Sequence, residues 1–511
     1  MVQGTSSGAG KTVLVAALCR ILANDGYSVA PFKSQNMSLN SAVTPDGLEI
    51  SRAQALQAMA ARIPPTVDMN PILLKPSGPG RSQVVLLGRP HVVLSAAGYY
   101  AGFARSLGLR TIRTAFRQVG EGRDVVIIEG AGSPAEPNLY DRDIANMAVA
   151  DLADAPVIIV ADIDRGGAFA SLLGTFHLLR PQHRRRVRGF LLNRFRGDVR
   201  LLGPALRDLE RRTGKPVLGV IPFIGSPDGV PGPRLTLPSE DSLDLGAERG
   251  APPAPGDVEV AVVAYPYLSN FTDVEALSVE PGVRVRYARQ PAELAAADLV
   301  ILPGSKNTVA DLAWLQERGM DWTLRTLART RPVLGICGGY QMLGTRIEDP
   351  HGIEGGTPGS YRALGLLPVV TRFDRRDKVT LPVTARAVGR SPLLQGLETR
   401  TMEGYEIRMG RPQLLPGARP ALRVISPGPS REEGAVDPSG RILGTSIHGL
   451  LDHPEVRSAV LGAVRRPHRP RRRGTWAREV HDVWEENLDR LAHVVRHSVD
   501  MKAIHRMLEA S

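Results

Sequence analysis

Short apolar runs alternate with helical patterns through the first half of the chain. Continuous apolar runs predict buried strands at 124–129, 156–162, 188–193 and 217–221, and residues 13–23 carry the spacing of a helix. Strands that are apolar throughout and separated by helices are typical of a parallel sheet covered on both faces. The first half is therefore predicted to be an α/β domain.

A second series of the same kind follows a stretch rich in Pro and Gly. Its apolar runs lie at 258–264, 298–302, 332–336 and 442–447, and its loops carry different chemistry from those of the first series. Turn-rich, aperiodic sequence is typical of a linker. The predicted organisation is a first domain at 1–225, a linker at 226–256, a second parallel-sheet domain at 257–463, and an Arg-rich connector with a helical tail at 464–511.

Composition limits the class of protein. The chain has 511 residues, too many for one ordinary core, and only 2 cysteines, too few for a disulfide framework, which favours a reducing compartment and a cytoplasmic protein. Its net charge of +12 comes mostly from arginine, since Lys occurs at only seven positions. We interpret this charge as surface composition and expect no nucleic-acid partner. No run reaches about 18 apolar residues, so we expect no membrane span.

A glycine-rich loop opens the first helix. Gly4, Gly8 and Gly10 precede Lys11 and Thr12, a pattern that lets backbone N–H groups converge on phosphate oxygens. Lys11 would reach the outer phosphates and the Thr12 hydroxyl would ligate Mg²⁺. Gly4 stands one residue earlier than in the usual phosphate-loop spacing. Because the loop begins so near Met1, either the strand before it is unusually short or the start has been placed too far downstream.

Carboxylates follow the apolar strands of the first domain. Glu129 ends one strand and is followed by Gly-Ala-Gly, and Asp162 and Asp164 end the next. Carboxylates at the edge of a sheet near a phosphate loop suit Mg²⁺. They could merely cap the helices that follow, but several carboxylates at one sheet edge favour a site. Asp46 lies in a Thr-Pro-Asp-Gly turn, where an ordinary turn role is the alternative to a metal role.

The second domain carries the pattern of a nucleophile elbow. Cys337 lies between an apolar strand and a helix and is flanked by glycines that permit a strained turn. The helix dipole would favour its thiolate, and the N–H groups of Gly338 and of Gly304, in a neighbouring strand-end loop, could face an oxyanion. Cys19 lies on the apolar face of the first helix and is interpreted as a packed core thiol.

A cysteine nucleophile needs a base, and the sequence offers two histidines. His448 directly follows an apolar strand, which places it at the sheet edge of the elbow, and we favour it. His453 stands in a His-Pro-Glu triplet, where Glu455 would orient it. The third member of the triad is left open.

Longer strings resemble the cobyric acid synthase family, the glutamine-hydrolysing amidases of cobalamin biosynthesis. They span residue 2 to about 462 and include Lys33–Ser41, Arg52–Gln57, Val67–Pro71, Leu74–Pro76, Glu129–Glu136, Asp141–Met147, Ala161–Gly167, Ser269–Asp273 and Leu302–Thr308. The family's usual Gly-Tyr-Glu-Ile-His-Met-Gly has Arg408 in place of histidine here.

The resemblance implies a fold and an activity. It implies a dethiobiotin-synthetase-like ATPase domain joined to a class I (flavodoxin-like) glutamine amidotransferase domain. ATP and Mg²⁺ would be held by Gly8, Gly10, Lys11, Thr12, Asp46 and Glu129, with Asn193 at the base. Cys337 and His448 would release ammonia from glutamine for four ATP-dependent amidations, of the b, d, e and g carboxylates of adenosylcobyrinic acid a,c-diamide.

Three rival interpretations remain open. One is the sister amidase that acts on the a and c carboxylates, against which Lys33–Ser41 and Asp141–Met147 speak. A second is a partition-type ATPase switch that binds nucleic acid. A third is an amidase that uses free ammonia. The oligomeric state is not indicated.

Overall fold

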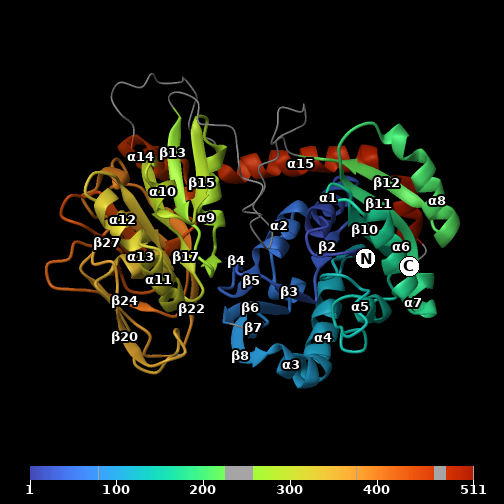
Figure 1. Ribbon diagram of the computed structural model, residues 1–511, viewed down its shortest axis with the longest axis horizontal. Coiled ribbons are helices and arrows are strands. Elements are labelled where there is room, and N and C mark those ends of the chain that lie inside the picture. The colour runs from blue at the N-terminus through green and yellow to red at the C-terminus, as the bar shows by residue number, and fades with distance from the viewer. Residues whose placement is uncertain (79, 225–256, 376, 465–478, 510–511) are drawn as a thin grey trace.

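The computed structural model describes residues 1–78, 80–224, 257–375, 377–464 and 479–509. The linker expected at 226–256 and the Arg run at 465–473 lie outside these residues. Figure 1 shows two bodies side by side, each built on its own sheet, with the first half of the chain on the right. Both are α/β bodies, as the apolar pattern predicts.

A parallel sheet forms the centre of the first domain. Four strands lie in the order β1-β10-β11-β12, and a parallel pair, β2-β9, is joined to them by a bridge between Val2 and Glu129. The strands are β1 (Val2–Gly4), β2 (Val29–Phe32), β9 (Val125–Ile128), β10 (Val157–Asp162), β11 (Val187–Phe195) and β12 (Val217–Pro222). Each strand predicted from the apolar runs is confirmed, and the short β1 pairs with β10 along its whole length.

Helices cover this sheet on both faces. Residues predicted as the first helix belong to α1, whose apolar side chains, Cys19 among them, are buried. The helices of this domain are α1 (Lys11–Asn24), α2 (Arg52–Ala60), α3 (Ala96–Gly98), α4 (Leu109–Gly120), α5 (Met147–Leu152), α6 (Ala168–Leu178), α7 (Pro181–Arg186) and α8 (Gly203–Thr213), with short turns of other helix types at Val67–Met69, Tyr99–Gly108 and Val199–Leu202.

Small strands that the apolar pattern does not predict face the second domain. They are β3 (Gln35–Met37), β4 (Ser41–Val43), β5 (Glu49–Ser51), β6 (Ile72–Gly78), β7 (Arg81–Leu86) and β8 (Arg89–Ser95). β6, β7 and β8 form an antiparallel meander, and β4 and β5 form a hairpin. β8 is exposed along most of its length, so it lacks the continuous apolar run of a buried strand.

The second domain has a central sheet in the order β15-β13-β16-β18-β28-β27, parallel except for β27. A five-stranded antiparallel sheet, β26-β25-β22-β23-β29, and a four-stranded sheet, β20-β19-β21-β24, complete it. The strands are β13 (Val258–Val263), β14 (Leu268–Ser269), β15 (Val283–Ala288), β16 (Leu299–Leu302), β17 (Gly304–Ser305), β18 (Val333–Ile336), β19 (Arg346–Asp349), β20 (Gly359–Arg362), β21 (Val369–Arg372), β22 (Val379–Ala387), β23 (Met402–Arg408), β24 (Arg411–Leu414), β25 (Leu422–Ser426), β26 (Arg431–Glu433), β27 (Ala435–Val436), β28 (Ile442–Thr445) and β29 (Ile447–His448).

Its helices are short. They are α9 (Thr272–Glu275), α10 (Pro291–Leu294), α11 (Thr308–Glu317), α12 (Met320–Leu327), α13 (Gly338–Leu343) and α14 (Pro454–Val464), with 3₁₀ turns at Ala276–Val279, Pro392–Leu394 and Leu450–Asp452. Two apolar clusters, one on each face of the central sheet, form the core of this domain.

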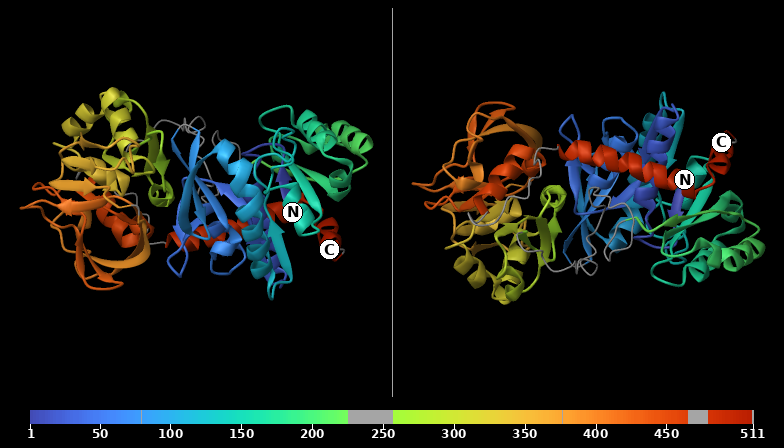
Figure 2. Two further views of the ribbon diagram at one scale, coloured as in Figure 1. Left: turned by 90° about the horizontal axis from the view of Figure 1, so that it is seen from below. Right: turned by 90° about the horizontal axis from the view of Figure 1, so that it is seen from above.

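The C-terminal helices return to the first domain. α15 (Val480–Ser498) and α16 (Met501–Glu509) confirm the predicted helical tail, and Figures 1 and 2 show α15 in red lying along the first domain, whereas α14 lies in the second. Leu488 and Leu491 of α15 are fully buried in one apolar cluster with α1. The buried Arg20 of α1 donates to Glu485 of α15 at 2.8 Å. Most of the tail is therefore part of the first domain's core, whereas Val480 and Trp484, at the start of α15, pack in a cluster of the second domain.

Among the helices in the described parts of the chain, none combines the length and the apolar character needed to cross a bilayer.

Replacing Leu488 with alanine tests the role of the tail. Because this side chain is fully buried, Leu488→Ala should lower the free energy of unfolding by about 2–5 kcal/mol, measured by denaturant unfolding. Arg490→Ala, at an exposed position of the same helix, is the matched control and should change stability little. Equal stability of the two variants would contradict the packing of α15.

Candidate active sites

The glycine-rich loop is shaped for phosphate. Gly8 and Gly10 have φ values of 75° and 89°, which favour glycine, and a Cβ on Gly10 would overlap the side chain of Asn193. Lys11 Nζ donates to the carbonyl oxygens of Ser6 at 2.9 Å and Gly132 at 3.1 Å. Lys11 thus lies across the mouth of the loop, where the outer phosphates of a nucleotide would sit.

Glu129 is the centre of a buried polar cluster behind that loop. One carboxylate oxygen accepts from Thr12 Oγ1 and from Lys33 Nζ, both at 2.8 Å, and the other accepts from Gln57 Nε2 at 2.5 Å and Gln54 Nε2 at 3.4 Å. Glu129 is 1% exposed. The strand-end carboxylate and the phosphate-loop threonine are therefore adjacent, as sequence reasoning expected, whereas the roles of Lys33 and Gln57 in this cluster were not foreseen.

Two other expected ligands lie differently. Asp46 is exposed on the turn between β4 and β5, where it accepts from Thr44 Oγ1 at 2.5 Å. The interactions found for it in the described residues are with Thr44 and with the charge of Asp68, not with Thr12 or Glu129. Among the described residues no hydrogen bond joins Asp46 to Thr12 or Glu129, so its role as a metal ligand stays a prediction. Its hairpin lies beside the second domain, where a Cβ on Gly47 would be 3.7 Å from Cδ of Pro382.

Asn193, expected at the base, instead supports the phosphate loop. Its amide nitrogen donates to the carbonyl oxygen of Ala9 at 3.0 Å, and its amide oxygen accepts from the backbone N–H of Arg194 at 2.9 Å. Both ends of this amide are occupied by the protein in the described structure. Asp162 and Asp164, at the same sheet edge, pair with Arg194 and Arg196.

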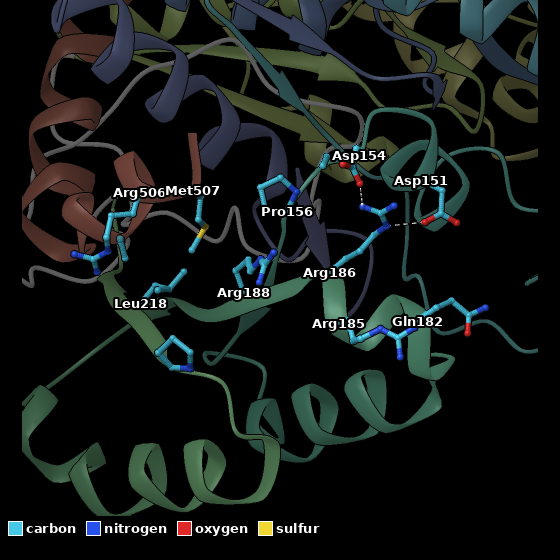
Figure 3. Close-up of a pocket in the computed structure, with 13 residues that line it drawn as sticks. Asp151, Asp154, Pro156, Gln182, Arg185, Arg186, Arg188, Leu218, Arg506 and Met507 are labelled. Atoms are coloured by element: carbon cyan, nitrogen blue, oxygen red, sulfur yellow. Dashed lines mark hydrogen bonds and ion pairs between the residues drawn. The ribbon is translucent and has the colours of Figure 1, made fainter. Parts of the chain in front are cut away.

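One hollow in the described part of the chain lies away from the phosphate loop. It is at the amino ends of β10, β11 and β12, the sheet edge opposite the loop, and α16 closes one side. Figure 3 shows Arg186 in it, paired with Asp151 and Asp154 at 2.6 and 2.7 Å. Nucleotide chemistry belongs at the carboxyl ends of the strands, so this hollow is not the ATP site.

The elbow of the second domain has the strained backbone that its sequence predicts. Cys337 has φ 50° and ψ −106° between β18 and α13, and its N–H donates to Thr445 at 2.8 Å. A non-glycine residue at positive φ is costly and is held only where the surroundings determine it. Gly338 and Gly339 allow the close approach: a Cβ on Gly338 would lie 2.7 Å from the Cβ of Ser305.

His448 is the histidine that the fold brings to Cys337. The two side chains line one cavity, and His448 is buried with its Nδ1 2.6 Å from Asp273 Oδ2. Its Nε2 makes no hydrogen bond of normal length within the described residues. Burial opposes the charged form, but the carboxylate of Asp273 and the neighbouring Cys337 outweigh it and raise the pKa of His448 to about 10.

The third member that sequence reasoning left open is supplied by Asp273. Its other oxygen accepts from the N–H of Gly449 at 2.9 Å, which fixes the carboxylate against the histidine loop. His453 instead points its Nε2 at the carbonyl oxygen of Glu403, and Glu455 is exposed on α14. Asp273 lies within the string Ser269–Asp273, and only that resemblance, not a local pattern, could have marked it.

The glycine expected in the oxyanion site also lies at the elbow. A Cβ on Gly304 would be 3.5 Å from Cε1 of His448 and 2.8 Å from the carbonyl oxygen of Ser269. Tyr405 stacks on His448 with ring centroids 5.3 Å apart. Cys337 and His448 thus line one cavity, with Gly304 beside His448 and Gly338 next to Cys337 in the chain. A thiol beside a histidine is what attack on an amide requires, and the oxyanion role of the two glycines stays a prediction.

Comparison with known proteins identifies the families to which the two domains are similar. Residues 1–225 match the CobQ/CobB/MinD/ParA nucleotide binding domain, and residues 259–456 match the CobB/CobQ-like glutamine amidotransferase domain. A phosphate loop in one domain and a cysteine elbow in the other define a glutamine-dependent amidoligase.

Relatives that match along most of their length show which family of glutamine-dependent amidoligases this is. A cobyric acid synthase of Sorangium cellulosum is 49% identical over 99% of this chain and 98% of its own length. One of Moorella thermoacetica is 50% identical over 91% and 88%, and one of Pelotomaculum thermopropionicum 47% identical over 99% and 96%. The chain belongs to the cobyric acid synthase family, and its place is in cobalamin biosynthesis.

Asparagine at position 273 tests the His448–Asp273 pair. Asp273→Asn removes the charge that holds the pKa of His448 high, so the imidazolium that favours the Cys337 thiolate is lost at a lower pH. Alkylation of Cys337 by iodoacetamide near neutral pH should therefore slow, and the profile of alkylation rate against pH should shift from that of the wild type. Cys19, the other cysteine, is buried with a raised pKa and should react slowly in every variant.

Glu455→Gln is the matched control for this experiment. Its carboxylate is exposed on α14, so the alkylation profile should stay at its wild-type position. A shift in Glu455→Gln with none in Asp273→Asn would show that the His448–Asp273 assignment is wrong.

Proposed function

We propose that the chain amidates the b, d, e and g carboxylates of adenosylcobyrinic acid a,c-diamide, using ATP and ammonia released from glutamine. The observation that carries the proposal is the pair of sites: a phosphate loop backed by Glu129, and Cys337 beside His448 in a second domain. The relatives' printed name supports the substrate class. We also propose that the chain acts on small molecules as a soluble enzyme of the cytoplasm.

The amidotransferase half supplies the nitrogen. The Cys337 thiolate attacks the amide carbon of glutamine, while N–H groups at Gly338 and Gly304 face the oxyanion. His448 gives a proton to the departing nitrogen, ammonia leaves, and a γ-glutamyl thioester remains. Water, deprotonated by His448, hydrolyses the thioester to glutamate and restores the thiol. Asp273 keeps the imidazole oriented throughout.

The phosphate-loop half supplies the electrophile. A carboxylate is a poor electrophile, so its oxygen first takes the γ-phosphoryl group of ATP, with release of ADP. Ammonia then attacks the acyl carbon, inorganic phosphate leaves, and the nitrogen loses a proton. Lys11 and the N–H groups of Gly8 and Gly10 would hold the phosphates, and Asn193 would keep the loop in place.

The oxygens of Thr12 and Glu129 fit a magnesium ion. They are hard ligands 2.8 Å apart, and Mg²⁺ commonly takes one or two protein oxygens with substrate phosphates. Within the described residues, no three His, Cys, Asp or Glu side chains gather as a metal site, so the nucleotide would have to provide the other ligands. Bound there, Mg²⁺ would neutralise phosphate charge.

The substitution Cys337→Ala distinguishes release of ammonia from glutamine from the ATP-dependent amidation that uses the ammonia. Cys337→Ala should abolish amidation with glutamine, because the nucleophile is gone, and keep amidation with ammonium chloride. Product formation from adenosylcobyrinic acid a,c-diamide and MgATP is followed by mass spectrometry, which also shows how many carboxylates react. Cys19→Ala, at the packed thiol, is the matched control and should keep both activities. Loss of neither activity in Cys337→Ala would overturn the elbow assignment.

Lys11→Ala should remove amidation with either nitrogen source. Without this ammonium group the transferred phosphate loses its compensating charge, and a fall of about a hundredfold or more in the ammonia-dependent rate is expected. Release of glutamate from glutamine, measured without the corrinoid, checks that the second domain still folds. If ammonia-dependent amidation survived in Lys11→Ala, ATP would have to bind elsewhere.

A further inference from the structure

Three lysines meet in the cavity that holds the amidotransferase site. Lys75, Lys306 and Lys378 line the same cavity as Cys337 and His448. Lys75 comes from β6 of the first domain, whereas Lys306 and Lys378 come from loops of the second. The cavity is therefore built by both domains, and its charged side chains gather at their boundary.

A fully buried carboxylate holds two of these lysines together. Glu49 of β5 accepts from Lys75 Nζ at 2.7 Å and from Lys378 Nζ at 2.5 Å, and from the hydroxyl of Ser41 at 2.8 Å. Burial alone would raise the pKa of Glu49, yet Lys378 and Lys75 hold it below its usual range. Burial lowers the pKa of Lys306, in spite of the opposing charge of Glu354, which attracts it.

Lysine is rare in this chain, which makes its placement informative. Of the seven lysines, Lys11 and Lys33 lie at the phosphate loop and three more belong to this cluster, whereas basic positions on the surface are nearly all arginine. An arginine has five N–H donors to satisfy in a fixed plane, and a lysine has three on a compact head. The compact ammonium group of lysine therefore suits these buried positions better than the guanidinium group of arginine.

The cluster lies between the two reaction sites. Asn270, which lines the Cys337 cavity, accepts from the N–H of Ser41 across the domain boundary at 3.1 Å. On the far side of Glu49, Ser51 of the same strand donates to Gln54 at 2.7 Å, and Gln54 donates to Glu129 at 3.4 Å. Buried polar groups thus continue from the elbow to the carboxylate behind the phosphate loop.

We propose that Lys75, Lys306 and Lys378, held by Glu49, form the doorway through which ammonia leaves the Cys337 cavity, and that their positive charge admits ammonia while excluding ammonium. The inference rests on the proposed function, since it assigns the step between its two half-reactions. The cluster acts on selectivity and does not touch the bonds that break.

Electrostatics makes such a doorway selective. Ammonia in water is mostly ammonium at neutral pH, and an ammonium ion entering a buried site with three ammonium groups meets like charges at short range. Neutral ammonia has no net charge to repel, and its lone pair can accept hydrogen bonds from the lysines. The pKa of Lys378 reflects the like charges around this side chain. Burial lowers this pKa most, the attraction of Glu49 raises it, and the repulsion from Lys75 and Lys306 lowers it further, to about 8.

An isotope competition tests the doorway in the full-length enzyme. Amidation runs with MgATP, the a,c-diamide and glutamine labelled with ¹⁵N at the amide, in the presence of excess unlabelled ammonium chloride. Mass spectrometry gives the ¹⁵N fraction of the product, and the glutamate formed per amide gives the coupling of the two sites. Wild-type product should be mainly ¹⁵N, because ammonium from solution is kept out.

Removing a charge should open the doorway. In Lys378→Met and in Lys306→Met, the ratio of unlabelled to labelled amide should rise by about threefold or more, and glutamate per amide should rise with it. In the part of the chain that the structure describes, the ion-pair partners of Glu49 are Lys75 and Lys378. Lys306→Met therefore keeps these contacts and serves if Lys378→Met fails to fold. Lys502→Met, exposed on α16, is the matched control and should behave as wild type.

Each outcome decides the question. Folded Lys378→Met and Lys306→Met enzymes with the wild-type isotope ratio would overturn the doorway and leave the proposed function standing. A change only in thermal stability, with the isotope ratio unchanged, would assign the lysines a structural role and also overturn it. A wild-type enzyme that forms no amide from glutamine would overturn the proposed function and this inference with it.

Discussion

The relation between the two domains depends on one buried carboxylate. Glu49 has no exposed side-chain surface, and its two ammonium partners, Lys75 and Lys378, come from different domains. A buried charge without partners is costly, so neither domain can move away without leaving a charge uncompensated. Together with the hydrogen bond from Ser41 to Asn270, this contact fixes how the halves face each other, so cavity residues from both halves share one space.

Each reaction site is positioned by the central sheet of its own domain. Glu129 and Cys337 both stand where a buried parallel strand ends, the first held by Thr12 and Lys33 and the second by a backbone bond to Thr445. The strands are rigid and buried, so the strain at Cys337 and the crowding around Glu129 can be maintained. Function is thus concentrated at strand ends, and the cores beneath are ordinary apolar packing.

The features that neighbouring residues encode could be predicted from the sequence. The strand at 156–162 is apolar throughout, and the loop before Lys11 and the turn at Cys337 each carry their chemistry within a few neighbours. Asp273 could not be reached in that way, since it is 175 residues from His448 in the chain and only the fold joins them.

Other features were missed for related reasons. Asp46 was expected to be a ligand because the resemblance implies it, but in the fold it accepts from Thr44 on the β4–β5 hairpin, and its metal role stays a prediction. The antiparallel strands β7 and β8 have exposed positions that break the apolar runs on which strand prediction depends. Lys306 and Lys378 are isolated in the sequence, so their convergence has no pattern to reveal it.

The return of α15 to the first domain has a consequence for the order in which the chain folds. Arg20 of the first domain is buried against a helix that a ribosome makes only after the whole second domain. The first domain therefore waits with part of an apolar surface uncovered while the whole second domain is synthesised and folds. Residues 1–225 expressed alone would lack that cover, whereas the second domain, whose core draws mainly on its own strands, can fold before the first is complete.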